Sequence, residues 1–293
     1  MKNPLFTGSG VALVTPFAND GPDLKAYAEL IRWQIAEGTD ALIACGTTGE
    51  PSTMSDDEQE AVVACAIAEA SGRVPVIAGI GGNNTAKVTA AAKKYKAMGA
   101  DGLLAVTPYY NKTTQKGLVS HFNAVADAAE LPVIVYNVPA RTGLNMTAAT
   151  YRKVADHPFI YGMKEASDDI KQISDMARLC PEVPLYSGND DQILPILSLG
   201  GLGVISVAAN IAPRMVHDLC AKWFAGDVAG AREIQFALSP LIKALFCETN
   251  PIPAKTALNL MGRNGGLLRL PLVEMEEANL DLLKREMAAL GLL

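Results

Sequence analysis

Residues 160–167 read IYGMKEAS, a short apolar run that stops at a lysine and a glutamate. Similar runs recur along the chain and show little alternation of apolar and polar side chains, which is typical of strands buried on both faces. The other runs cover residues 11–15, 41–45, 74–78, 102–106, 132–136, 184–187 and 203–207. The sequence therefore predicts buried strands along most of its length, one of which ends at Lys164.

Segments with helical spacing separate these runs, among them residues 23–37, 56–70 and 85–98. Strands and helices alternate at intervals of roughly 20–35 residues, which favours a (β/α)8 TIM barrel of the α/β class. A doubly wound sheet is the alternative architecture. From about residue 215 the pattern is helical only, beyond what one closing helix requires. We therefore predict a barrel over residues 1–224 and a C-terminal helical extension over residues 225–293.

The composition bounds the function before any motif is considered. The chain has 293 residues, of which 49% are hydrophobic and 19% charged, and its net charge is −6. A net negative charge argues against nucleic-acid binding and against a polybasic membrane surface. The five cysteines include no CxxC pair, so neither a disulfide framework nor a zinc cage is expected. With no signal-peptide pattern and no membrane-spanning run, we expect a soluble cytoplasmic protein.

Lys164 is the first candidate for chemistry. Catalytic side chains of a barrel gather where its strands end, at the C-terminal face. A lysine that points into this mouth loses solvation, which lowers its pKa and yields a neutral amine that can condense with a carbonyl. The alternative is a lysine just outside the strand that reaches water or pairs with Glu165.

A second candidate is the loop Gly46-Thr47-Thr48-Gly49-Glu50, which follows another predicted strand. The flanking glycines allow the backbone to approach a ligand closely, and two adjacent hydroxyls can bind a carboxylate. The alternative is a turn that caps the next helix. Cys45 precedes the loop, and we interpret it as a buried, inert thiol because no histidine lies near it in sequence.

Tyr136 and Arg141 follow the predicted strand at 132–136. A phenol at a strand end can relay protons, and an arginine can hold a carboxylate through two parallel hydrogen bonds. A tyrosine at the core edge and a surface arginine are the alternatives. Tyr109 and Tyr110 follow the strand at 102–106, and an interface role suits such an exposed pair.

The histidines offer no competing chemistry. His121, His157 and His217 lie far apart and match no metal-ligand spacing, so we expect no metal site. The glycine-rich stretch at 79–87 matches neither common phosphate-loop pattern and is interpreted as a strand-to-helix turn.

Taken in order, these motifs resemble those of the dihydrodipicolinate synthase / N-acetylneuraminate lyase family of class I aldolases. The resemblance covers nearly the whole chain. It rests on Gly10-Val11-Ala12-Leu13-Val14-Thr15-Pro16-Phe17, Gly46-Thr47-Thr48-Gly49-Glu50, Thr107-Pro108-Tyr109-Tyr110-Asn111, Tyr136-Asn137-Val138-Pro139, Gly162-Met163-Lys164-Glu165-Ala166-Ser167, Ser187-Gly188-Asn189-Asp190, Gly203-Val204-Ile205-Ser206-Val207 and Asn250-Pro251-Ile252-Pro253-Ala254-Lys255.

Within the family, the Thr47-Thr48 pair and Arg141-Thr142-Gly143 are similar to the branch that condenses pyruvate with L-aspartate 4-semialdehyde on the diaminopimelate route to lysine. The resemblance implies no metal or organic cofactor. The alternatives are another pyruvate-dependent aldolase of the family, acting on N-acetylneuraminate or a keto-deoxy sugar acid, and a barrel without catalytic turnover.

The resemblance also implies roles for single residues. Lys164 would form the imine with pyruvate, while Tyr136, Thr47 and Tyr110 would move protons, with Tyr110 reaching in from a neighbouring subunit. The substrate-binding set would be Thr48, Arg141, Gly188 and Ile205. The expected assembly is a homotetramer, a dimer of dimers.

One departure from the family concerns regulation. Members inhibited by lysine bind it at positions that correspond here to Ser52, Asp56, Gln59, Asn83, Lys87 and Tyr109. Lys87 stands where those members carry an acidic side chain, and a second cation should repel the effector. We therefore expect weak inhibition by lysine or none.

Overall fold

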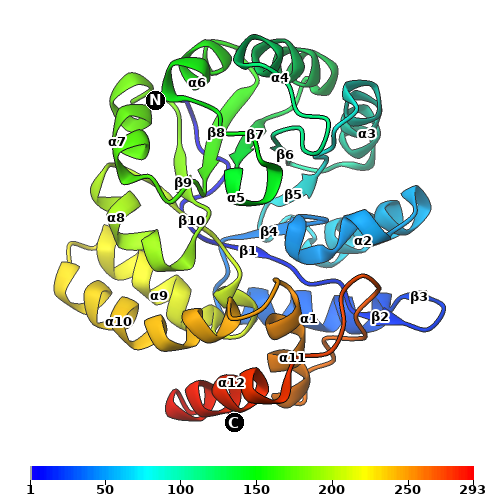
Figure 1. The fold of residues 1–293 in the computed structure, drawn as a ribbon, viewed down its shortest axis with the longest axis vertical. Coiled ribbons are helices and arrows are strands. Elements are labelled where there is room, and N and C mark those ends of the chain that lie inside the picture. Colours follow the sequence, from blue (N-terminus) through cyan, green and yellow to red (C-terminus); the bar gives the residue numbers. More distant parts are fainter. Residues whose placement is uncertain (1) are drawn as a thin grey trace. The chain divides into compact units, whose positions relative to one another are not determined.

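The computed structural model of the chain describes residues 2–293. Over that range eight parallel strands form a closed barrel in the order β1-β10-β9-β8-β7-β6-β5-β4 (Figure 1). The predicted TIM barrel is therefore confirmed. Its strands are β1 (Gly8–Ala12), β4 (Ala41–Ala44), β5 (Val76–Gly79), β6 (Gly102–Val106), β7 (Val133–Asn137), β8 (Ile160–Glu165), β9 (Leu185–Ser187) and β10 (Gly203–Ser206).

The described chain divides into two compact units, and each is considered by itself. The first contains Pro75–Ile205 and the segment before Gly8. Outside its strands, α3 packs on α4, α4 on α6, and α6 on α7 (Figure 1). The helices of this unit are α3 (Thr85–Met98), α4 (Gln115–Ala129), α5 (Pro139–Thr142), α6 (Ala148–Ala155), α7 (Ile170–Leu179) and α8 (Ile193–Ser198).

The second unit contains Gly8–Val74 and Ser206–Leu293. In it β1 pairs with β4, α1 packs on α2, and α10 packs on α9 and on α12. Its helices are α1 (Leu24–Ala36), α2 (Asp56–Ala70), α9 (Pro213–Phe224), α10 (Val228–Leu245), α11 (Ile252–Leu260) and α12 (Glu277–Ala289). Ser55 starts α2 with a capping box, in which its hydroxyl and the Glu58 carboxylate each accept a backbone N–H.

Most predicted boundaries agree with the structure within two residues, and the largest difference is at β1. The run predicted at 11–15 is a strand over Gly8–Ala12, because Gly8, Ser9 and Gly10 are buried without being apolar. The paired two-residue strands β2 (Phe17–Ala18) and β3 (Gly21–Pro22) were not predicted. The C-terminal region also differs, because residues 261–276 contain no helix. The division at residue 224 stays a prediction.

No helix within residues 2–293 combines the length and the apolar character that crossing a bilayer requires.

Candidate active site

Lys164 and Tyr136 lie side by side at the C-terminal ends of β8 and β7. The two residues are register partners in this parallel pair, so their side chains leave the sheet on the same face. The Lys164 Nζ atom lies 4.2 Å from the centroid of the Tyr136 ring. Lys164 is 5% exposed and Tyr136 6% exposed. The structure thus places an amine against a phenol in a nearly dry position.

Burial changes the acid–base state of Lys164. Loss of hydration disfavours the ammonium and lowers the pKa of Lys164 to about 7, although the Asp190 carboxylate favours the charged form. The Arg141 guanidinium adds to the lowering. Near neutral pH a large share of the amine is therefore unprotonated, which is the form that attacks a carbonyl.

Glu165 does not serve as the partner of Lys164, although it follows directly in sequence. Successive strand residues point to opposite faces, and Glu165 accepts hydrogen bonds from Asn137 Nδ2 at 3.1–3.2 Å and from the Ser167 amide at 2.8 Å. Burial raises the pKa of Glu165 to about 7. Asn137 and Glu165 are also register partners, so they join β7 and β8 directly behind Tyr136 and Lys164. The Asn137–Glu165 pair was not predicted from the sequence.

Gly188 leaves room for the lysine stem. A Cβ atom at this position would lie 2.7 Å from Ala166 Cβ and 3.2 Å from Lys164 Cε. Any larger residue at position 188 would therefore press on the Lys164 side chain. Ile205 is fully buried in β10, which pairs with β9.

Arg141 lies in the short helix α5 that begins two residues after β7, and its side chain is exposed. The next residue fixes this helix, because Thr142 Oγ1 donates to Val138 O at 3.2 Å and accepts from Thr107 Oγ1 at 3.3 Å. Tyr110 lies in the loop after β6 and is 90% exposed, with a positive φ of 64°. Its phenol therefore projects into solvent from a backbone conformation that non-glycine residues rarely adopt.

In the second unit, Thr47 and Thr48 begin a 3-10 turn, Thr47–Gly49, that follows β4. Thr48 is buried and Thr47 half-buried. Left-handed residues bracket this loop, Cys45 with φ 54° and Glu50 with φ 56°. Burial raises the pKa of Cys45 to about 12, which fits the inert thiol expected from sequence.

The positions assigned to lysine inhibition are mostly at the surface. Ser52 and Asp56 are exposed, and Gln59 is half-buried. In the other unit, Lys87 is exposed in the first turn of α3, Asn83 is half-buried before that helix, and Tyr109 is 38% exposed.

The histidines occupy separate places, each with its own partner: His121 with Thr85, His157 with Asp127 and His217 with Asp40. Within the part of the chain that the structure describes, no group of three or more acidic, histidine or cysteine residues could hold a metal ion.

A desolvated lysine at the C-terminal end of a barrel strand, beside a tyrosine, is the arrangement of an enzyme that forms a Schiff base with its substrate. The comparison with known proteins agrees. Residues 5–290 match the dihydrodipicolinate synthetase family, and the chain belongs to this family.

Individual relatives match over nearly their full length. A protein named 4-hydroxy-tetrahydrodipicolinate synthase from Thermoanaerobacter sp. strain X514 is 54% identical over 292 residues, which is 99% of this chain and 98% of the relative. The crystal structure of dihydrodipicolinate synthase from Thermotoga maritima is 44% identical with a TM-score of 0.96, covering 99% of this chain and 100% of that one. The Acinetobacter baumannii enzyme, described as complexed with pyruvate, is 41% identical with a TM-score of 0.95, covering 98% and 99%.

Proposed function

We propose that this chain is a lyase that catalyses the reaction for which its relatives are named, 4-hydroxy-tetrahydrodipicolinate synthesis. It would condense pyruvate with L-aspartate 4-semialdehyde on the diaminopimelate route to lysine. The observation that carries this proposal is the buried Lys164 amine, with its pKa lowered to about 7, held 4.2 Å from the Tyr136 ring in a chain of this family.

The chemistry begins at the neutral Lys164 amine. It attacks the carbonyl carbon of pyruvate, and loss of water gives a protonated imine, which acts as an electron sink. The pyruvate methyl group then loses a proton to form an enamine, whose carbon attacks the aldehyde of the second substrate. The amine of that substrate displaces Lys164 and closes the ring, so the enzyme returns to its starting state.

Each of these steps moves a proton, which is the work we assign to Tyr136. Its phenol lies beside Nζ and can donate a proton to the departing water and take one from the methyl group. By resemblance to the family, Thr47 and Tyr110 link Tyr136 to bulk solvent. The exposure of Tyr110 suits a side chain that enters the site of a neighbouring subunit.

The remaining site residues bind substrate in this proposal. By the same resemblance, Thr47 and Thr48 hold the pyruvate carboxylate, and Ile205 lines the pocket around it. Arg141 holds the semialdehyde carboxylate, with backbone from Gly188. The guanidinium of Arg141 lies close enough to Lys164 to lower its pKa, which supports a place beside the reacting centre.

The assembly and the location belong to the same proposal: a cytoplasmic homotetramer in which Tyr110 is shared across an interface. Sedimentation velocity of wild type and Tyr110→Phe tests the assembly independently of the chemistry. A monomer with full activity would contradict the shared tyrosine.

Weak lysine inhibition is also proposed, because Lys87 places a cation where an acidic side chain would attract the effector. An initial-rate titration with lysine should show little loss of activity in the millimolar range. Strong inhibition below one millimolar would refute this expectation.

The reaction itself is tested by one assay panel. Purified protein with pyruvate should consume L-aspartate 4-semialdehyde, while N-acetylneuraminate and keto-deoxy sugar acids should not be cleaved. Cleavage of a sugar acid without turnover of the semialdehyde would assign the chain to another aldolase of the family. Inactivity toward every substrate would favour a barrel without turnover.

A further inference from the structure

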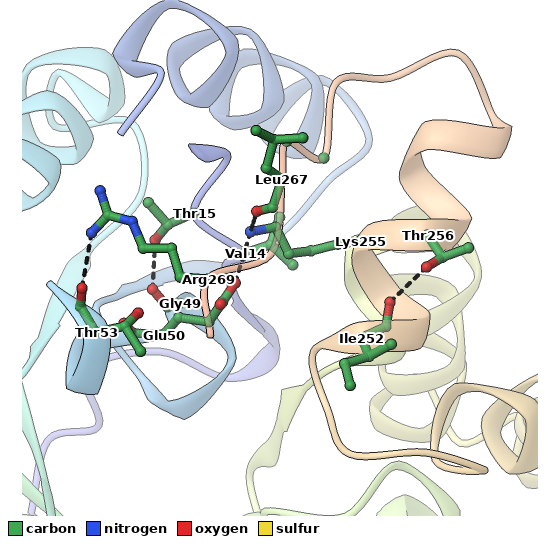
Figure 2. Close-up of polar contacts among 12 residues, drawn as sticks. Val14, Thr15, Gly49, Glu50, Thr53, Ile252, Lys255, Thr256, Leu267 and Arg269 are labelled. Carbon is green, nitrogen blue, oxygen red and sulfur yellow. Dashed lines mark hydrogen bonds and ion pairs between the residues drawn. The ribbon is translucent and has the colours of Figure 1, made fainter. Parts of the chain in front are cut away.

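A fully buried ion pair holds the end of the Thr47–Gly49 turn. Lys255 Nζ in α11 lies 2.7 Å from Glu50 Oε1, and their side chains are 1% and 2% exposed (Figure 2). The two residues are 205 positions apart in sequence. Desolvating two charges is costly, and an apolar pair of similar volume is often as stable. We therefore look for a role of this ion pair in positioning the loop, in addition to any effect on stability.

The lysine is itself fixed from several sides. Lys255 Nζ also donates to Leu267 O at 2.5 Å and lies 4.4 Å from the centroid of the Phe17 ring. The Leu267 amide in turn donates to Phe17 O at 2.8 Å. Residues on both sides of the Lys255 side chain therefore hold Nζ in place, and a shift of Glu50 would break a buried ion pair.

The same C-terminal region contacts the turn at a second point. Asn250 Nδ2 donates to Thr48 Oγ1 at 2.9 Å, in a buried position. A hydroxyl has one hydrogen to donate and two lone pairs. Because Thr48 Oγ1 accepts from Asn250, its own hydrogen points away from Asn250 and can be donated to another acceptor. The contact therefore sets the direction of the Thr48 hydroxyl as well as its place.

We propose that Asn250 and Lys255 are positioning residues for pyruvate: they orient the Thr47-Thr48 loop so that the Thr48 hydroxyl donates to the substrate carboxylate. This inference rests on the proposed function. It explains why the loop keeps the left-handed Glu50, a conformation that costs energy and that a buried partner holds in place. The C-terminal region would then serve the reaction without touching substrate.

A double-mutant cycle tests the coupling between Asn250 and Thr48. Borohydride trapping of the imine at increasing pyruvate gives a half-saturation concentration for wild type, Asn250→Ala, Thr48→Val and the double variant. Each single change should raise this concentration about tenfold, since Thr48→Val removes the hydrogen bond to the carboxylate and Asn250→Ala removes the contact that orients it. The double variant should be no worse than Thr48→Val, because both changes remove the same interaction.

Thr256→Val is the matched control. Thr256 Oγ1 donates to Ile252 O at 2.9 Å within the same helix, away from the turn (Figure 2). This variant should leave the half-saturation concentration within twofold of wild type. Hydrogen exchange of the peptide that spans residues 43–54 should quicken in Asn250→Ala and in Lys255→Met but not in the control. If Lys255→Met does not fold, the Asn250 variants still decide the matter.

The possible failures are distinct. Multiplicative effects in the double variant, or unchanged exchange of the loop in Asn250→Ala, would overturn the positioning role while leaving the aldolase chemistry intact. A wild-type protein that forms no imine at Lys164 would refute the proposed function, and this inference with it, before any variant is compared.

Discussion

Two buried lysines in this chain have opposite surroundings. Lys164 in β8 and Lys255 in α11 are 5% and 1% exposed, and the Nζ atom of each lies over an aromatic ring, Tyr136 for Lys164 and Phe17 for Lys255. Lys255 has a carboxylate at 2.7 Å, whereas the carboxylate next to Lys164 in sequence, Glu165, bonds to Asn137 and Ser167 on the other face of the strand. Burial lowers the pKa of both lysines, and Glu50 opposes that effect at Lys255.

The difference shows that burial alone does not make a lysine reactive. Desolvation acts on both residues, but at Lys255 the Glu50 carboxylate at 2.7 Å opposes it and favours the ammonium, which is not a nucleophile. At Lys164 the Asp190 carboxylate raises the pKa, but burial lowers it by more. One lysine is therefore suited to covalent chemistry and the other to holding a loop.

The same substitution at both positions gives the sharpest contrast. Lys164→Met keeps the volume of the side chain but removes the nucleophile, so kcat should fall by at least ~10⁴-fold. Thermal unfolding should show a melting temperature no lower than wild type, because an apolar group replaces a desolvated amine. Residual activity above one per cent of wild type would mean that the reaction proceeds without this amine.

Lys255→Met should instead lower the stability of the protein. It leaves Glu50 buried without its partner, which costs about 3–5 kcal/mol of stability in comparable cases. Denaturant unfolding of Lys255→Met and of the double variant Glu50→Gln/Lys255→Met measures this cost. The double variant should recover most of the loss, and equal destabilisation in both would show that the ion pair is not its source.

Tyr136→Phe separates the role of the hydroxyl from that of the aromatic ring. The ring remains beneath Lys164 Nζ, but the proton-transferring hydroxyl is lost, and kcat should fall about 10²-fold. Imine trapping at saturating pyruvate should still label Lys164, though more slowly. The control is Tyr186→Phe, because the Tyr186 hydroxyl donates to Phe6 O instead. A similar loss of kcat in both variants would argue against a specific proton role.

The smallest expected effect is the pH dependence of imine formation. The pKa of Lys164 lies at about 7, below its ordinary 10.5. The reactive neutral form therefore increases as pH rises through 7 and then levels off. Between pH 6 and pH 8 the rate of imine formation should rise roughly tenfold. A rate that keeps rising toward pH 10 would indicate an ordinary, hydrated lysine.

The strands could be predicted from the sequence, and Lys164 could be singled out as a candidate, because both leave local signals. Buried parallel strands are continuous apolar runs, and a lysine that ends such a run stands out. The Glu50–Lys255 and Asn250–Thr48 contacts leave no such signal, since their partners are 205 and 202 residues apart. Glu165 shows the same limit. Its place next to Lys164 in sequence made a Lys164–Glu165 pair one alternative, but strand alternation turns Glu165 toward Asn137 instead.

The contrast between the two lysines is tested most directly by borohydride reduction in the presence of pyruvate, followed by peptide mass spectrometry. We expect one pyruvate-derived adduct, on the peptide that contains Lys164, and an unmodified peptide containing Lys255. An adduct on Lys255 or another lysine, or none on Lys164, would contradict it.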